Sequence, residues 1–117
     1  MKKNVLLLSL GGAGVISDAK RLSTDADVEL FGGSSLEDAR AAFARTKIDH
    51  VIVGAGIDLE TRLEIVREIF QLSTETTVHL KDRISGKEGF LPFIEAVLDG
   101  LRNYEATAAA TDSAPGP

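Results

Sequence analysis

Two glycine-rich segments contain the residues whose type and spacing suggest chemistry. Gly11, Gly12 and Gly14 follow one apolar run, and Gly54 and Gly56 follow another. Glycine has no Cβ, so its backbone N–H groups can approach a bound anion closely. A phosphate group at the start of a helix is commonly bound in this way. The two segments therefore predict a binding site for a phosphorylated small molecule.

A competing explanation for these glycines remains open, because a tight turn from a strand into a helix needs glycine even without a ligand. The segment from Gly12 to Ser17 has the spacing of a dinucleotide-binding motif whose last glycine is replaced by serine. NAD(P) or another nucleotide is therefore the cofactor class to test. The acidic residue that binds the ribose of NAD is absent, and Gly32 and Ser34 stand in its region.

Two cations follow the fourth apolar segment. Lys81 and Arg83 are placed to reach the binding site predicted at the glycine segments, where they could neutralise a phosphate. The alternative is that they belong to a solvated charged loop. Neither His50 nor His79 is assigned a role, and we assign no catalytic residue and no metal ligand. The predicted ligand-binding residues are Gly11, Gly12, Gly14, Gly32, Ser34, Gly54, Gly56, Lys81 and Arg83.

Composition excludes several other classes of function. The chain has 117 residues, a net charge of −5 and no cysteine. An acidic balance argues against nucleic-acid binding and against a polybasic membrane anchor. The lack of cysteine excludes disulfides, thiolate zinc sites and cysteine nucleophiles. The apolar run at Val5–Leu8 is too short to be a signal peptide or a membrane span, so we expect a cytoplasmic protein.

Strands and helices alternate along the chain, which predicts an α/β fold with helices on both faces of a parallel sheet. The apolar and alternating segments predict strands at 4–10, 27–31, 48–53 and 76–81. Helical periodicity predicts helices at 15–23, 35–46, 58–72 and 90–102. We expect one domain at 1–103 and a disordered tail at 104–117, whose composition is poor in apolar residues.

Side-chain types predict how two of these helices begin and how one of them packs. Ser34 with Glu37 resembles a capping box, and Asp58 is a suitable cap for the third helix. The spacing of four, three and four in the third helix predicts an inward apolar stripe of Leu59, Leu63, Val66 and Phe70, widened by Ile65, Ile69 and Leu72. Its charged residues, which include Arg62, are expected to face the solvent.

The polarity of the strands predicts their order in the sheet. The first strand and the end of the third are apolar throughout, as strands covered on both faces must be. The second and fourth carry polar residues, which is typical of sheet edges. The predicted order is therefore 2-1-3-4, a three-layer flavodoxin-like or Rossmann-like arrangement. In this order, the direction in which the chain adds strands to the sheet reverses between strands one and three. Both glycine segments begin there, and open α/β sheets bind ligands at such points.

Part of the chain resembles a response-regulator receiver domain, from Asp27 to about Leu72. The residue that ends the third strand is the phosphorylated aspartate of that family, and Gly54 stands there. Gly11 and Gly12 replace the acidic pair that holds magnesium, and a fifth strand and helix are missing. The resemblance implies a receiver-like interaction module without phosphorylation chemistry.

The chain also resembles the nucleotide-binding half of short-chain dehydrogenases, through Gly11–Gly14 and the segment Asp49–Gly56. The Tyr-x-x-x-Lys motif of that family is absent, because Tyr104 is followed four residues later by Ala108. The segment from Gly54 to Leu101 is similar to small uncharacterised bacterial α/β proteins, a likeness that implies the fold and adds no activity.

Three functions remain open from the sequence. The first is a non-catalytic domain that binds a nucleotide or another phosphorylated small molecule at the glycine loops. The second is a protein-interaction or homodimerisation module, since an open four-stranded sheet has two free edges. The third is a small enzyme acting on a sugar nucleotide or using a nicotinamide cofactor, although the chain shows no nucleophile–base pair and no paired carboxylates.

Overall fold

The computed structural model describes residues 3–10, 12–22 and 28–110. Four parallel strands in these ranges form one sheet in the order β2-β1-β3-β4, which confirms the predicted order. Val5 of β1 pairs with Leu30 of β2 and with His50 of β3. The bounds of the strands are β1 (Lys3–Leu8), β2 (Val28–Gly33), β3 (His50–Val53) and β4 (Thr77–Leu80).

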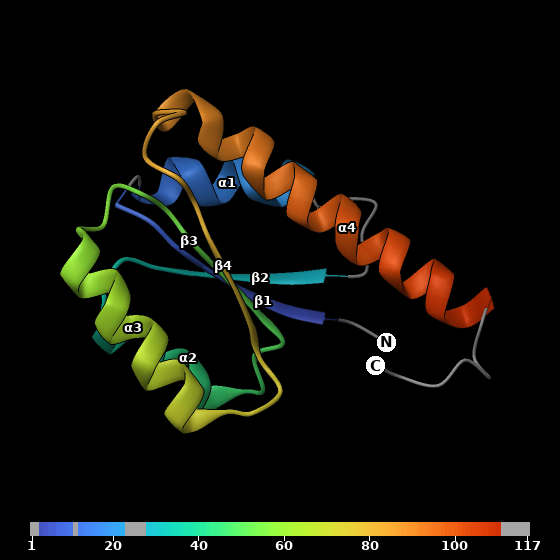
Figure 1. The fold of residues 1–117 in the computed structure, drawn as a ribbon, viewed down its shortest axis with the longest axis horizontal. Helices are drawn as coiled ribbons and strands as arrows, with labels where there is room; N and C mark the ends of the chain where they lie inside the picture. The colour runs from blue at the N-terminus through green and yellow to red at the C-terminus, as the bar shows by residue number, and fades with distance from the viewer. Residues whose placement is uncertain (1–2, 11, 23–27, 111–117) are drawn as a thin grey trace.

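Helices cover both faces of this sheet. Figure 1 shows α1 and α4 on one side and α2 and α3 on the other. The chain therefore has the three-layer α/β/α architecture of a flavodoxin-like or Rossmann-like fold. The bounds of the helices are α1 (Gly12–Leu22), α2 (Leu36–Arg45), α3 (Leu59–Leu72) and α4 (Phe90–Ala110), and a 3-10 turn, η1 (Lys87–Gly89), precedes α4.

The apolar runs of β1 and β3 lie at the centre of two hydrophobic cores. Successive side chains of a strand point to opposite faces. Leu6 and Leu8 therefore pack beneath α2 and α3, whereas Val5 and Leu7 pack beneath α1 and α4. All four side chains are buried. Burial on both faces explains why neither strand alternates in polarity, as the sequence indicated.

Two helix boundaries differ from the sequence prediction. Helix α1 begins at Gly12 instead of residue 15, so Gly12 and Gly14 lie in its first turn and not in a loop before it. Helix α4 continues to Ala110, past the predicted end at residue 102. The alanine-rich composition after Tyr104 explains the extension, because alanine is the strongest helix former. The rest of the predicted tail, residues 111–117, lies outside the described residues.

The cap of α2 is Ser35, so the prediction of Ser34 was wrong by one residue. The Ser35 hydroxyl accepts a hydrogen bond from the Asp38 backbone N–H at 3.1 Å. The Asp38 carboxylate in turn accepts the Ser34 backbone N–H at 2.8 Å. Asp58 caps α3 as predicted, accepting the Thr61 backbone N–H at 3.3 Å.

The buried face of α3 follows the prediction only in part: Ile65 and Ile69 face the core as expected, whereas the stripe that includes Leu59 is exposed. Arg62, Ile65 and Ile69 are buried against the sheet. Leu63 is 48% exposed and Phe70 is 54% exposed. Both sets of residues follow helical spacing, and the position of α3 beside α2 decides which of them faces the core.

No helix within the described ranges is long and apolar enough to cross a membrane.

Candidate functional site

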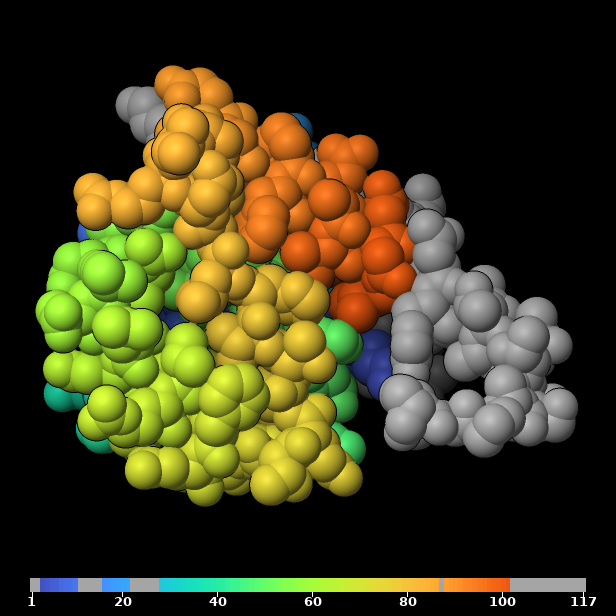
Figure 2. Space-filling model, viewed as in Figure 1, coloured from blue at the N-terminus to red at the C-terminus, as the bar shows by residue number. Residues whose placement is uncertain are grey.

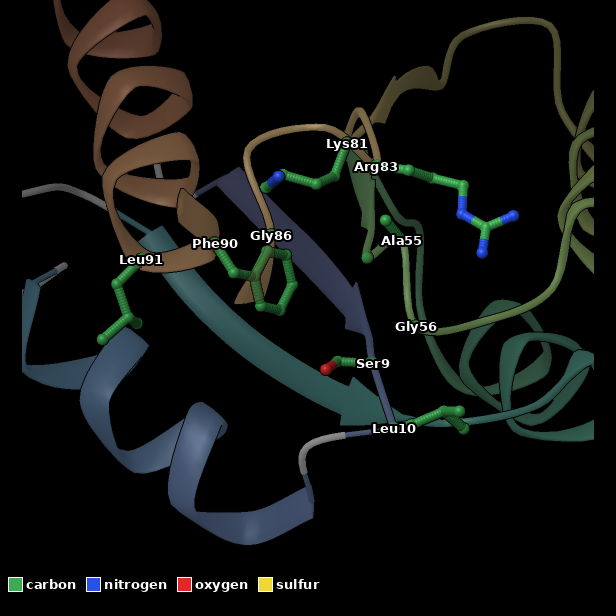
Figure 3. Close-up of a pocket in the computed structure, with 10 residues that line it drawn as sticks. Ser9, Leu10, Ala55, Gly56, Lys81, Arg83, Gly86, Phe90 and Leu91 are labelled. Atoms are coloured by element: carbon green, nitrogen blue, oxygen red, sulfur yellow. The ribbon is translucent and has the colours of Figure 1, made fainter. Parts of the chain in front are cut away.

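A cavity of about 600 Å³ lies at the carboxyl ends of β1, β3 and β4. It is the place where the winding of the sheet reverses, between β1 and β3. Leu10, Phe90 and Leu91 supply apolar walls, and Gly54 and Gly56 line the cavity where the chain leaves β3. Figure 3 shows Phe90 at the start of α4 and Leu10 at the end of β1, with the Leu10 side chain on the side of Gly56.

Lys81, the first residue after β4, lines this cavity but is almost fully buried. Its ammonium group donates to the Asp82 carbonyl at 2.8 Å, to the Asp82 carboxylate at 3.3 Å and to the Ser85 hydroxyl. Three acceptors match the three donors of a lysine ammonium group. Lys81 therefore organises the loop after β4 and has no donor left over for a ligand.

Asp82 completes this loop. Its carboxylate accepts the Ser85 backbone N–H and the Ser85 hydroxyl, both at 2.9 Å. These two hydrogen bonds, with a smaller contribution from Lys81, lower the pKa of Asp82 to about 2. The loop then turns at Gly86, whose φ of +68° is a conformation that L side chains rarely adopt. The segment 81–86 is thus held in one shape beside the cavity.

Arg83 is the cation that this loop presents to solvent. Its side chain is exposed and lines the cavity. Within the described residues, no hydrogen bond or ion pair engages its guanidinium group. Figure 3 shows Arg83 extending on the side of Ala55 and Gly56, whereas Lys81 points away from it. A guanidinium group in this position is suited to bind phosphate or carboxylate through paired hydrogen bonds.

Arg62 supports the same end of β4 from beneath. The sequence predicted a solvated side chain, but Arg62 is buried. Its Nη1 donates to the Lys81 carbonyl oxygen at 2.9 Å, and its Nε has no hydrogen-bond partner in the structure. A buried guanidinium group that holds the backbone of Lys81 explains the exception to the polar pattern of α3.

The structure brings four of the predicted ligand-binding residues into one cavity: Gly54, Gly56, Lys81 and Arg83. Gly12 and Gly14 lie in the first turn of α1. Because two residues of chain span at most about 7 Å, this turn begins close to Leu10 of the cavity wall. Gly11 lies outside the described residues.

Gly32 and Ser34 serve packing and capping at the end of β2. A Cβ added to Gly32 would lie 1.8 Å from the Ile16 Cδ1, so glycine here lets α1 approach β2 closely. Ser34 donates its backbone N–H to Asp38 of α2. These contacts account for both residues without a ligand.

Ser9, Leu10, Gly86, Phe90 and Leu91 are cavity residues that sequence reasoning missed. For Ser9 and Leu10 a signal was present, because they stand directly before the glycine segment at the predicted reversal point. For Phe90 and Leu91 there was none, since their periodicity indicates a helix face and does not indicate which end of the sheet the helix approaches.

The chemistry available in the cavity is binding by one exposed cation, polar backbone and apolar walls. Among residues 3–10, 12–22 and 28–110, no group of three or more histidine, aspartate or glutamate residues could hold a metal ion. His50 and His79 contact each other, with the Nδ1 of His50 3.3 Å from the Nε2 of His79, but they line a separate cavity beneath α4. Burial lowers the pKa of His79.

Comparison with known proteins adds no functional assignment. The chain matches no protein-family model, no curated protein and no solved structure.

Proposed function

We propose that this chain binds a small anionic molecule with an apolar or aromatic part, such as a nucleotide or another phosphorylated compound, in the cavity after β1, β3 and β4. The observation that carries the proposal is the position of the cavity at the reversal point of the sheet. Small-molecule sites of open α/β sheets lie there, and they commonly have volumes of roughly 300–1,000 Å³.

The lining of the cavity matches the two parts of such a molecule. Phe90 and Leu10 offer apolar surface to a base, a flavin or a similar ring. Arg83 offers positive charge to a phosphate. Gly56 is exposed and leaves the backbone accessible beside that charge, whereas Gly54 is buried and donates its backbone N–H to the Leu8 carbonyl at 2.9 Å. Binding is therefore assigned to Arg83 and Gly56, while Gly54 forms the base of the cavity and Lys81 keeps the loop of Arg83 in place.

Gly56 offers a direct test of this proposal. A Cβ at Gly56 would meet Leu10 no closer than 3.8 Å, so the fold has room for a side chain. We expect Gly56→Asp to weaken the binding of ATP, NAD, NADP, FMN or a sugar nucleotide by about 10-fold or more, since a carboxylate beside the anion repels it. Calorimetric titration of the wild-type chain first identifies which of these probes binds.

Gly56→Asn is the matched control, because asparagine has the size of aspartate without its charge. The proposal expects Gly56→Asn to bind more tightly than Gly56→Asp and expects Arg83→Ala to lose affinity for the same probe. If none of the five probes binds the folded wild-type chain, or if both Gly56 variants bind as the wild type does, the proposal is contradicted.

A further inference from the structure

An apolar surface runs along the β4 side of the molecule. It consists of Leu59, Leu63, Val66 and Phe70 of α3 together with Leu80 of β4, and we call it the α3–β4 apolar edge. Leu59 is 53% exposed and Leu80 is 46% exposed. Figure 2 views the molecule from this side and shows β4 at the surface between α3 and α4.

Two contacts place the apolar side chains of α3 beside β4. Glu68 faces α2, because its carboxylate accepts two hydrogen bonds from Arg40, both at 3.1 Å. Ile65 and Ile69 face the sheet. At 100° per residue, the stripe from Leu59 to Phe70 lies on the remaining lateral side of α3, opposite Glu68. That side projects past β4.

The β4 strand itself ends the sheet within the described residues. The Thr77 backbone N–H bonds to the Asp49 carbonyl at 3.1 Å, and the Lys81 N–H bonds to the Val53 carbonyl at 2.9 Å. Alternate residues of a strand direct their N–H and C=O groups to opposite sides. The N–H and C=O groups of Val78 and Leu80 therefore point outward, at the open edge of the sheet.

We propose that a second copy of this chain docks on the α3–β4 apolar edge, with the two β4 strands paired antiparallel about a two-fold axis. A register centred on His79 is the one that uses the outward groups of both Val78 and Leu80. Val78 of each copy exchanges hydrogen bonds with Leu80 of the other, and the axis passes beside His79. An isologous interface of this kind needs one self-complementary surface, which is what an open strand edge provides.

The spacing of the helices fits this arrangement. Helix α3 connects β3 to β4, and for a crossover helix centred over the two strands that it joins, the axis lies about half a strand spacing inside β4. The two-fold axis lies about half a spacing outside β4. With strands about 4.8 Å apart, the two copies of α3 lie about 10 Å from each other, close to the usual packing distance of two helices. The apolar stripes then face each other across the axis.

Charged residues that flank the stripe are complementary under the same symmetry. Glu60 stands in the first half of α3, Arg67 stands in the second half, and both are exposed. A two-fold axis sets the two helices antiparallel. Arg67 of each copy is then placed near Glu60 of the other, so opposite charges meet at the rim of the interface, whereas a parallel arrangement would align like charges.

The available area is in the range that a dimer needs. Leu59, Leu63, Phe70 and Leu80, each about half exposed, offer on the order of 400 Å² of apolar surface, which is the size of patch that often forms a binding surface. The strand edge and the charged rim extend the contact toward the roughly 800 Å² per partner of a stable complex. The opposite edge strand, β2, buries its Leu30 and offers no comparable patch among the described residues.

A matched pair of variants on α3 tests the interface. Leu63 is 48% exposed on the proposed interface, and Leu72 is 50% exposed outside it. The wild-type chain is expected to show a mass approaching twice 12.4 kDa in light scattering as its concentration rises. Leu63→Glu is expected to raise the dimer dissociation constant about 100-fold or more, because it buries an unpaired charge. Leu72→Glu is expected to dimerise as the wild type does.

A crosslink tests the register. The chain has no cysteine, so a single introduced thiol reports one position. His79→Cys places the thiols of the two copies opposite each other and is expected to form a disulfide-linked dimer under mild oxidation. Thr77→Cys, on the same face of β4, is expected to remain uncrosslinked, because its counterpart in the second copy lies across from Lys81.

Three results would overturn the proposal. The first is a wild-type chain that stays monomeric up to about 1 mM, which would leave the edge to a different partner. The second is a dimer that Leu63→Glu does not weaken. The third is equal crosslinking of the two cysteine variants, which would exclude the register about His79.

Discussion

At the residue scale, Lys81 shows how a buried cation can shape a site without contacting a ligand. Its ammonium group holds Asp82 and Ser85, and its carbonyl accepts a hydrogen bond from Arg62. The loop that carries Arg83 thus depends on a lysine that is itself hidden. Removing Lys81 is expected to affect stability, whereas removing Arg83 is expected to affect binding.

We expect Lys81→Met to lower the free energy of unfolding by about 1–3 kcal/mol, because methionine fills much of the volume but removes the hydrogen bonds that the ammonium group donates to Asp82 and Ser85. Urea denaturation followed by circular dichroism measures the difference. Arg83→Met is the control, and its exposed position predicts a change within about 0.5 kcal/mol. Equal stability of the wild type and Lys81→Met would show that the hydrogen bonds of the ammonium group do not hold the loop.

Arg62 and Ser35 show why single residues were harder to place from the sequence than whole elements were. Ile65 and Ile69 were predicted to face the core, but the charge of their neighbour Arg62 counted against its burial. Its burial depends on the Lys81 carbonyl, which is distant in sequence. Either Ser34 or Ser35 can cap α2, and the choice depends on where β2 ends.

At the element scale, α4 combines a packed face with an unpacked glycine. Ile94 and Leu98 are buried against the sheet. Gly100 lies on the exposed face, and a Cβ there would meet no atom within 4 Å. Glycine inside a helix costs conformational entropy on folding that alanine does not. Gly100 therefore lowers the stability of α4, although no neighbouring atom requires a glycine there.

We therefore expect Gly100→Ala to raise the free energy of unfolding by about 0.5–1 kcal/mol. Gly54→Ala is the contrasting variant, because its Cβ would lie 3.2 Å from the Phe90 Cζ and crowd the start of α4. Thermal unfolding of both variants is the measurement. A lower melting temperature for Gly100→Ala would mean that another part of the molecule packs too closely against Gly100 to leave room for a methyl group.

At the scale of the whole molecule, the sheet order was predictable because the polarity of a strand reports how many of its faces are covered. The apolar β1 and β3 are central, and the more polar β2 and β4 are edges. The reversal point, and with it Gly54 and Gly56 of the cavity, followed from that order. The apolar walls did not follow, because the approach of Phe90 to β3 depends on a loop that Lys81 and Asp82 shape.

Acid is expected to destabilise the molecule through its hydrogen-bonded carboxylates. The pKa of Asp82 falls to about 2, and hydrogen bonds also lower the pKa of Asp38, Asp58 and Glu68. A carboxyl group whose pKa is lower in the folded state than in the unfolded state stabilises the fold at pH values above the unfolded pKa. That contribution is lost as the pH falls from about 4 toward 2.

Urea denaturation of the wild type and Asp82→Asn at pH 7, 5, 4 and 3 measures this effect. The wild type is expected to be the more stable of the two at pH 7, and the difference is expected to shrink as the pH falls through the range in which Asp82 becomes protonated. A difference that stays constant from pH 7 to pH 3 would show that the charge of Asp82 does not contribute to stability.

The most direct test of ligand binding at the reversal point is an amide NMR titration of the labelled chain with ATP, NAD, NADP, FMN and a sugar nucleotide. The proposal expects at least one of them to shift the signals of Ser9, Leu10, Gly54, Gly56 and the segment 81–90 together. A well-dispersed spectrum that no ligand changes, or shifts confined to residues away from the cavity, would contradict it.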